Sequence, residues 1–158
     1  MNLNQRIHSQ LLTKLSSTEA SADELNNSLR LLAKWRSVLI QNTLLQKHGT
    51  TVMQGPLSGM AFIKESAEGC HIAKILGCYE QPLQPFIEQA IHKNYSSVLN
   101  IGCAEGYYAV GMARSMPHSK VFAFDLNPKA QETCKALAKA NQVAERVQVG
   151  SLFNPEQF

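Results

Sequence analysis

The sequence contains no long apolar run. No window approaches the roughly 18 uninterrupted apolar residues that a membrane-spanning helix needs. The first six residues, Met1 to Arg6, also lack the apolar core of a secretory signal. We therefore expect a soluble, cytoplasmic protein that has no membrane partner.

Cysteine is sparse and lies in no recognisable pattern. The four cysteines form neither a Cys-x-x-Cys pair nor a spacing typical of zinc sites. Without a secretory signal, this usage predicts reduced and mostly buried thiols. Cys70 and His71 are adjacent and could form a nucleophile or ligand pair, although neighbours in sequence need not face one another. We predict no metal site. The cysteines are Cys70, Cys78, Cys103 and Cys134.

A strong excess of one charge is also missing. The net charge is +3, and residues 1–50 hold all of it, with six Lys/Arg against three acids. The remaining 108 residues carry nine charges of each sign. Nucleic-acid binding needs a denser basic patch with aromatic or groove-reading elements, so the charge argues against a nucleic-acid partner. A solvated helix face is the simpler interpretation.

Residues 1–49 are predicted to form a helical region. Apolar residues at spacings of four predict a helix over residues 3–16. Ser21 and Glu24 have the spacing of a capping box, which predicts a second helix that ends before Gly49. Its apolar stripe is more typical of a packing surface than of a cofactor site. The two helices could cover the core, pair with a second subunit or form a lid.

Residues 50–94 are predicted to lead into the main domain. Short strands are expected over residues 50–53 and 60–63, around a turn rich in glycine. A short helix is expected over 71–76 and a longer one from Pro82 or Leu83 to His92. The residues expected to be buried on the longer helix are Phe86, Ile87, Ala90 and Ile91.

One stretch organises the rest of the chain. The apolar run from Val98 to Ile101 predicts a buried parallel strand, and a turn of small residues follows it. A helix is predicted over 107–116, and a second strand, over 120–124, ends at Asp125. Strand, glycine loop, helix, strand and terminal acid together indicate the start of a nucleotide-binding βαβ unit.

The pattern continues with one more helix and strand. Asn127 is expected to cap a helix that has Pro128 in its first turn and ends near residue 140. A third strand is predicted over 146–149. The fold class expected is therefore Rossmann-like, a three-layer α/β/α domain with parallel strands, of which residues 95–158 supply the first three. The residues expected to be buried on this helix are Ala130, Cys134, Leu137 and Ala138.

The glycine spacing distinguishes between two cofactor classes. A dinucleotide fingerprint, G-x-G-x-x-G, needs a glycine at position 107, where this chain has a tyrosine. The chain has Gly102, Ala104 and Gly106 instead. The stretch from Val98 to Ala113 resembles motif I of the class I S-adenosylmethionine-dependent methyltransferases. Asp125 is similar to the acid that closes the second strand in that family.

The resemblance implies S-adenosylmethionine as the cofactor. It implies that the loop from Gly102 to Gly106 passes beneath the methionine part. The carboxylate of Asp125 would accept hydrogen bonds from both ribose hydroxyls, and Leu126 would lie against the adenine edge. The residues that the resemblance assigns to the cofactor are Asn100, Gly102, Cys103, Ala104, Glu105, Gly106, Tyr107, Asp125 and Leu126.

Three residues depart from the family pattern. Asn100 stands where the family usually has an acid, so it can accept a hydrogen bond but brings no negative charge. Ala104 replaces the middle glycine, so we expect the loop to lie farther from the ligand or to keep a negative φ there. Ser151 stands near the place where an acid commonly meets the adenine amine. Each change is expected to weaken binding without abolishing it.

A shorter resemblance precedes motif I. The residues Leu76-Gly77-Cys78-Tyr79-Glu80 are similar to a lead-in segment of FkbM-like methyltransferases. That resemblance makes Tyr79 and Glu80 candidates for the cofactor or acceptor side of the pocket. A helix end with a solvated acid explains the same residues equally well. No catalytic base can be assigned from the sequence.

Two functions from different classes fit these features. The first is an S-adenosylmethionine-dependent methyltransferase, of which this chain is the amino-terminal part and lacks the acceptor half. The second is a non-catalytic nucleotide-binding or dimerisation module that keeps half of a Rossmann fold. In either case a homo-oligomer could form through the amino-terminal helices or through the open edge of the first strand.

Overall fold

The computed structural model describes residues 1–16, 21–64 and 70–157. The chain divides into two compact units, Met1–Lys47 and His48–Phe158, which are considered separately. Among the described residues, no helix combines the length and apolar character needed to cross a membrane.

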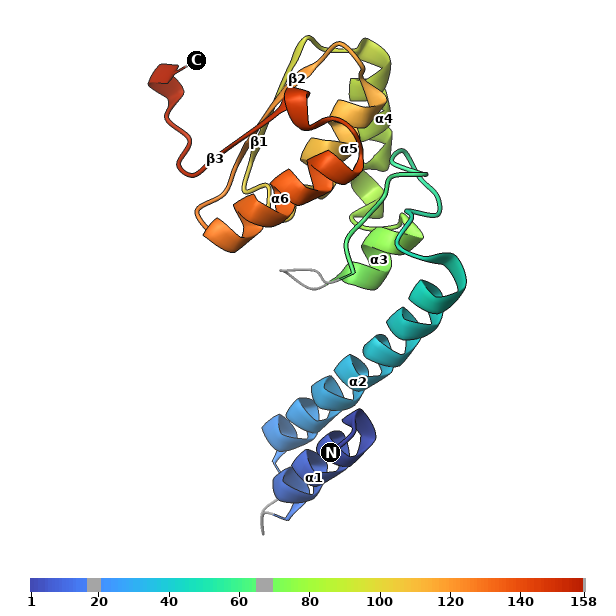
Figure 1. Cartoon of the computed structure of the whole chain (residues 1–158). Coiled ribbons are helices and arrows are strands. Elements are labelled where there is room, and N and C mark those ends of the chain that lie inside the picture. Colours follow the sequence, from blue (N-terminus) through green and yellow to red (C-terminus); the bar gives the residue numbers. More distant parts are fainter. Residues whose placement is uncertain (17–20, 65–69, 158) are drawn as a thin grey trace. The chain divides into compact units, whose positions relative to one another are not determined.

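The first unit consists of two helices, α1 (Leu3–Leu15) and α2 (Ala22–His48), as the sequence predicts (Figure 1). The capping box predicted for α2 is present. The backbone N–H of Glu24 donates to the Ser21 hydroxyl at 3.2 Å, and the Glu24 carboxylate accepts from the Ser21 N–H at 3.2 Å. Two donors that a helix start leaves without partners are thereby satisfied.

The contact between α1 and α2 is narrow. Ile7 is buried, and the Trp35 indole N–H donates to the Asn4 side chain at 2.9 Å. Several large apolar side chains of the unit remain exposed. Five leucines have exposed fractions between 40% and 65%, namely Leu12, Leu15, Leu25, Leu29 and Leu32.

The prediction of two strands within residues 50–63 is wrong. This segment contains one antiparallel bridge, between Thr51 and Ala61. The N–H of Val52 donates to the Met60 carbonyl at 2.9 Å, and the N–H of Phe62 donates to the Thr50 carbonyl at 2.8 Å. Two short segments pairing only with each other form a marginal ladder, so β-prone residues alone do not produce strands here.

The lead-in helices are α3 (His71–Leu76), the 3₁₀ turn η1 (Gln81–Leu83) and α4 (Gln84–Lys93). The short helix agrees with its prediction, but the longer one begins later than expected because Pro82 lies in η1. The buried face predicted for α4 is wrong. None of its residues is buried, and Phe86 is 68% exposed.

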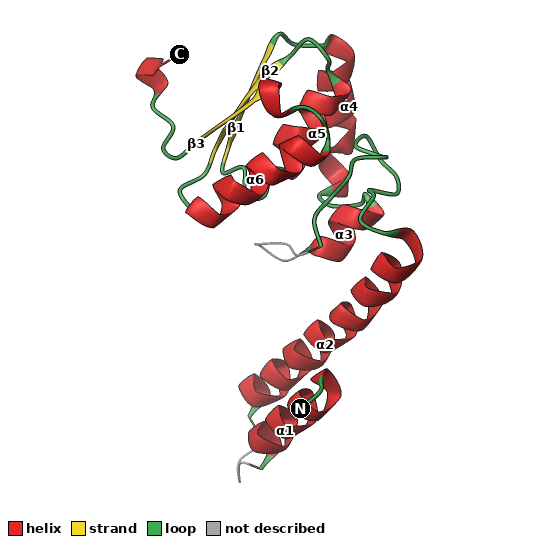
Figure 2. Ribbon diagram, viewed as in Figure 1, coloured by secondary structure: helices red, strands yellow, loops and turns green. Residues whose placement is uncertain are grey.

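The second unit contains a parallel sheet in the order β1-β2-β3 (Figure 2). Its elements are β1 (Ser97–Ile101), α5 (Tyr107–Ser115), β2 (Lys120–Phe124), α6 (Pro128–Ala140), the turn η2 (Ala144–Arg146), β3 (Val147–Gly150) and the turn η3 (Pro155–Gln157). Parallel strands joined by helices confirm a partial Rossmann-like α/β fold preceded by a helical region.

The two faces of this sheet differ in burial. Val121 and Ala123 are completely buried on the face that α5 covers. The strand register places Leu99 beside Phe122 and Ile101 beside Phe124 on the opposite face. Leu99 is 44% exposed and Ile101 59% exposed, so the expectation of a buried first strand is wrong. Among the described residues, one face of the sheet lacks its helical layer.

Candidate functional site

The loop from β1 to α5 depends on glycine at two positions for different reasons. Gly106 has φ +93°, and a Cβ there would lie 2.5 Å from the Cys134 sulfur, so glycine lets α5 approach α6 closely. Gly102 has φ +73°, but a Cβ there would meet no atom of the described residues within 4 Å. The space beside Gly102 is therefore open.

Ala104 adopts a conformation that the sequence analysis did not expect. Its φ is +47°, in the left-handed region, so the expectation of a negative φ is wrong. The N–H of Ala104 donates to Asp125 Oδ2 at 2.8 Å, and the N–H of Gly106 donates to the Cys103 carbonyl at 2.8 Å. These two hydrogen bonds hold the loop in a shape that alanine ordinarily avoids.

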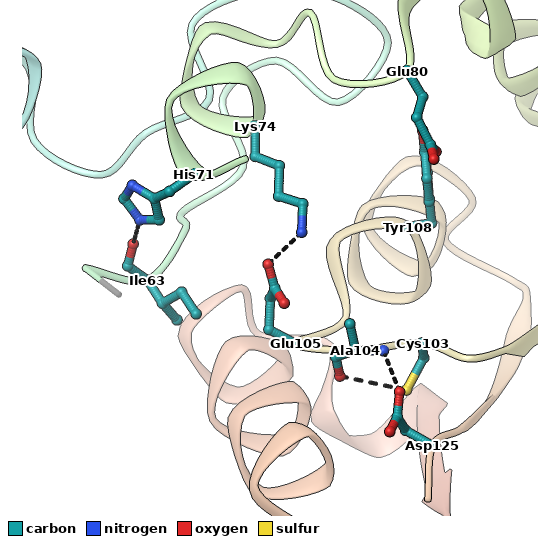
Figure 3. A network of polar contacts seen from close by, with 9 residues as sticks. All are labelled: Ile63, His71, Lys74, Glu80, Cys103, Ala104, Glu105, Tyr108 and Asp125. Carbon is teal, nitrogen blue, oxygen red and sulfur yellow. Dashed lines mark hydrogen bonds and ion pairs between the residues drawn. The ribbon is translucent and has the colours of Figure 1, made fainter. Parts of the chain in front are cut away.

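Asp125 lies at the carboxyl end of β2 and is half-buried. Its Oδ2 accepts the Ala104 N–H (Figure 3). Its Oδ1 accepts the N–H of Asn127 at 2.9 Å. A carboxylate offers about four lone-pair sites. Asp125 can therefore hold the loop and still accept two further hydrogen bonds from a ligand.

A groove at the carboxyl edge of the sheet, here called the Asp125 groove, has a volume of about 420 Å³. In parallel α/β sheets, ligands bind outside this edge of the strands. Leu126 lines the groove and is 72% exposed, and Ser151 lies on its wall. The complete lining is Ile101, Gly102, Phe124, Asp125, Leu126, Ser151, Leu152 and Phe153.

A second hollow, here called the Asn100 cavity, has a volume of about 140 Å³. Gly102 lines both this cavity and the Asp125 groove. The Asn100 Oδ1 atom is buried and accepts no hydrogen bond from the residues that the structure describes. The lining joins the loop to the lead-in segment and consists of Lys74, Tyr79, Glu80, Asn100, Gly102, Cys103, Ala104, Tyr107 and Tyr108.

Glu105, like Gly106, belongs to the loop but lines neither hollow. Its carboxylate is 0% exposed and lies 2.5 Å from the Lys74 ammonium, whose side chain is 3% exposed (Figure 3). Lys74 Nζ also lies 4.7 Å from the centre of the Tyr79 ring. The sequence analysis missed Lys74. A lone lysine within the otherwise largely apolar helix His71–Leu76 was the available signal.

Three tyrosines gather beside the loop. The ring centres of Tyr79 and Tyr107 are 5.7 Å apart, and those of Tyr107 and Tyr108 are 5.3 Å apart. The Tyr108 hydroxyl donates to Glu80 Oε2 at 2.8 Å. Burial raises the pKa of Tyr107 to about 12, and burial followed by the hydrogen bond to Glu80 raises the pKa of Tyr108. Both phenols stay protonated at neutral pH.

Cys70 and His71 do not form a reactive pair. The imidazole Nε2 of His71 lies 2.6 Å from the Ile63 carbonyl, whereas Cys70 is exposed. Within residues 1–16, 21–64 and 70–157, no group of three or more His, Cys, Asp or Glu side chains could hold a metal ion. Cys103 and Cys134 are buried, and Cys78 is partly exposed.

No family model matches this chain. Curated relatives include the release factor glutamine methyltransferases of two Chlamydia trachomatis serovars, L2 and D. Each is 28% identical over 83 residues, a match that covers 49% of this chain and 29% of the relative. The similarity to methyltransferases that the sequence predicts is therefore also found in the comparison with curated proteins. The chain spans less than a third of the length of these relatives.

Solved structures with similar folds include two methyltransferases. An RNA methyltransferase from Salinibacter ruber in complex with S-adenosylhomocysteine has a TM-score of 0.38 and 15% identity, covering 44% of this chain and 47% of that one. Coclaurine N-methyltransferase bound to N-methylheliamine and S-adenosylhomocysteine has a TM-score of 0.41 and 19% identity, covering 94% of this chain and 42% of that one.

Proposed function

We propose that this chain is the cofactor-binding part of an S-adenosylmethionine-dependent methyltransferase. One observation carries the proposal. Gly102, with open space beside it, lies between the Asp125 groove and the Asn100 cavity. A cofactor with a nucleoside end and an amino-acid end needs two adjoining hollows of this kind. The similarity to the release factor glutamine methyltransferases supports the same function.

The residues present fit this cofactor. Asp125 retains acceptor sites for two ribose hydroxyls, and the exposed side chains of Leu126 and Leu152 offer an apolar wall for the base. Asn100 Oδ1 is a buried acceptor that can take a hydrogen bond from the amino-acid end. Glu105 would act indirectly, by fixing the loop through Lys74.

The role of this chain in the reaction would be binding and orientation. S-adenosylmethionine supplies a methyl group on a positively charged sulfur. Methyl transfer needs chiefly the alignment of that group with an acceptor atom, which the loop and Asp125 would provide on the cofactor side. Tyr107 and Tyr108 remain protonated at neutral pH, so neither would serve there as a general base.

Asp125→Ala is expected to weaken S-adenosylmethionine binding by about 1–3 kcal/mol, the usual loss when hydrogen bonds to a charged group are removed. Isothermal titration calorimetry of the wild type and the variant measures this difference. Asp23→Ala removes an exposed acid from the first turn of α2 and is the matched control, which should bind as the wild type does.

Two outcomes would contradict this proposal at different levels. If the wild-type chain shows neither heat nor a thermal shift with millimolar S-adenosylmethionine, the cofactor proposal fails. If the wild type binds and Asp125→Ala binds equally well, the carboxylate is not the ribose acceptor. Circular dichroism of each variant verifies that the fold persists, because Asp125 also accepts the Ala104 and Asn127 N–H groups.

A dimerisation module is the second candidate, and the exposed leucines of α1 and α2 favour it. Contiguous exposed apolar surface on a helical pair is typical of an interaction site. We expect the full chain to sediment as a dimer at micromolar concentration, and Leu25→Gln with Leu29→Gln to sediment as a monomer. A wild-type chain that stays monomeric would contradict this candidate. The calorimetric result with S-adenosylmethionine tests the first candidate independently.

A further inference from the structure

We propose that the Asn100 cavity binds a primary ammonium group and that Glu80 supplies the negative charge. This inference rests on the proposed function and specifies which chemical group the second hollow recognises. The ammonium could belong to the amino-acid end of the cofactor or to an amine that accepts the methyl group. Both sources share the same chemistry, and the experiment below separates them.

The charges around the cavity favour a cation. Lys74 and Glu80 are the charged residues among the described ones that line it. The Lys74 ammonium lies 2.5 Å from the Glu105 carboxylate, which compensates its charge. Glu80 is then the carboxylate in the lining whose charge Lys74 does not compensate. Its side chain is exposed, so it lies at the mouth of the cavity. The cavity therefore carries a net negative charge.

The hydrogen-bonding groups at the cavity also fit an ammonium. Such a group has three N–H donors and no acceptor. The Asn100 Oδ1 atom is a buried acceptor, and the Glu80 carboxylate is an acceptor as well. The tyrosine rings offer further attraction for a cation. Lys74 Nζ lies 4.7 Å from the centre of the Tyr79 ring and already occupies it, so this attraction would come from Tyr107 and Tyr108, which line the same cavity.

The backbone holds Glu80 in an unusual conformation for this role. Glu80 has φ +45°, and Ala104, on the same cavity, has φ +47°. Left-handed conformations of residues other than glycine cost energy and persist where the surroundings impose them. The Tyr108 hydroxyl fixes the Glu80 carboxylate through a hydrogen bond of 2.8 Å. Tyr108 is thus a positioning residue for Glu80.

The first experiment compares two ligands that differ in the ammonium-bearing end. S-adenosylmethionine and 5′-methylthioadenosine, which lacks the amino-acid end, are titrated calorimetrically into wild type and Glu80→Gln. We expect Glu80→Gln to weaken S-adenosylmethionine binding about tenfold, at the low end for a hydrogen bond to a charged group, because Glu80 is exposed. Binding of 5′-methylthioadenosine should change less than about twofold. Tyr108→Phe should shift S-adenosylmethionine binding in the same direction, by less.

The control variant is Glu145→Gln. It removes the same charge at the η2 turn, which precedes β3 at the amino edge of the sheet, and should alter neither affinity. Glu80→Gln keeps the size of an exposed side chain, so thermal unfolding should match the wild type. If the wild type binds neither nucleoside, the proposed function fails. If it binds both and Glu80→Gln weakens both equally, the ammonium inference alone fails.

The second experiment identifies the source of the ammonium. Butylamine is titrated into protein saturated with 5′-methylthioadenosine and into protein saturated with S-adenosylhomocysteine, which carries its own ammonium. Binding only in the first case assigns the cavity to the cofactor. Binding in both cases that Glu80→Gln removes assigns it to an acceptor amine. If Glu80→Gln changes neither S-adenosylmethionine affinity nor butylamine binding, the inference is overturned.

Discussion

Replacing Gly77 by alanine is expected to lower the free energy of unfolding by about 3 kcal/mol or more. Gly77 ends α3 with φ +75°, a conformation that costs an L-residue about 1–2 kcal/mol. A Cβ at this position would lie 1.9 Å from the Gln54 carbonyl oxygen and 2.6 Å from its carbonyl carbon. Backbone atoms cannot turn aside as a flexible side chain can, so overpacking adds about 1–3 kcal/mol. Urea unfolding of the full chain measures the change.

Gly49→Ala is the matched control for Gly77→Ala. Gly49 has φ +68°, close to that of Gly77, but a Cβ there would meet no atom within 4 Å in the part of the chain that the structure describes. The control therefore isolates the conformational cost, and we expect a loss of about 1 kcal/mol. Equal losses at Gly49 and Gly77 would show that the contact with Gln54 relaxes without cost. A larger loss at Gly77 would show that the close approach to the Gln54 backbone has a cost of its own.

The features that the sequence predicted well are local ones. The cap of α6 is Asn127, whose side chain accepts the N–H of Lys129 at 3.0 Å, and Pro128 occupies the first turn. The four residues expected to be buried on α6 are the four that the structure buries. Caps, turns and helical periodicity depend on residues within a few positions of one another, so they can be predicted from the local sequence alone.

Burial of an element could be predicted only where another element of this chain packs against it. Val98–Ile101 forms the expected strand, but Leu99 and Ile101 remain exposed because no described helix lies over that face. Phe86 on α4 is exposed for a similar reason. An apolar run indicates that a surface favours burial. It does not show which element buries it, since that depends on contacts distant in sequence.

The candidate site also combines local features with long-range contacts. The tight turn and the acid at the end of the second strand could be predicted because the glycines and Asp125 follow fixed intervals in the sequence. The pairing of Lys74 with Glu105 could not be predicted, because 31 positions separate the two residues and no single motif contains both. The positive φ of Ala104 also depends on a distant partner, Asp125. Long-range polar contacts of this kind are supplied by the fold.

Lys74→Met is expected to lower the free energy of unfolding by about 3–5 kcal/mol. The substitution keeps much of the volume of the side chain but removes the cation that pairs with the Glu105 carboxylate, which is 0% exposed. Removing one member of a buried pair usually costs this amount, because an uncompensated charge stays in a medium of low dielectric constant. Urea unfolding of wild type and variant measures the loss.

A second substitution separates loss of charge balance from loss of packing. Glu105→Gln in the Lys74→Met background removes the buried charge, so we expect the double variant to recover most of the lost stability. Lys129→Met is the surface control. Lys129 and Glu132 form an ion pair at 3.9 Å with exposed fractions of 78% and 74%, and breaking it should cost less than about 0.5 kcal/mol.

Lys74→Met and the double variant also test how Glu105 acts on the loop. If Lys74 fixes the loop from Gly102 to Gly106 through Glu105, Lys74→Met should weaken S-adenosylmethionine binding, and the double variant should regain part of it. A Lys74→Met variant as stable as wild type would show that water or another group compensates Glu105. If Lys74→Met and the double variant are equally unstable, the loss comes from packing around Lys74, and the buried charge would no longer explain how the loop is held.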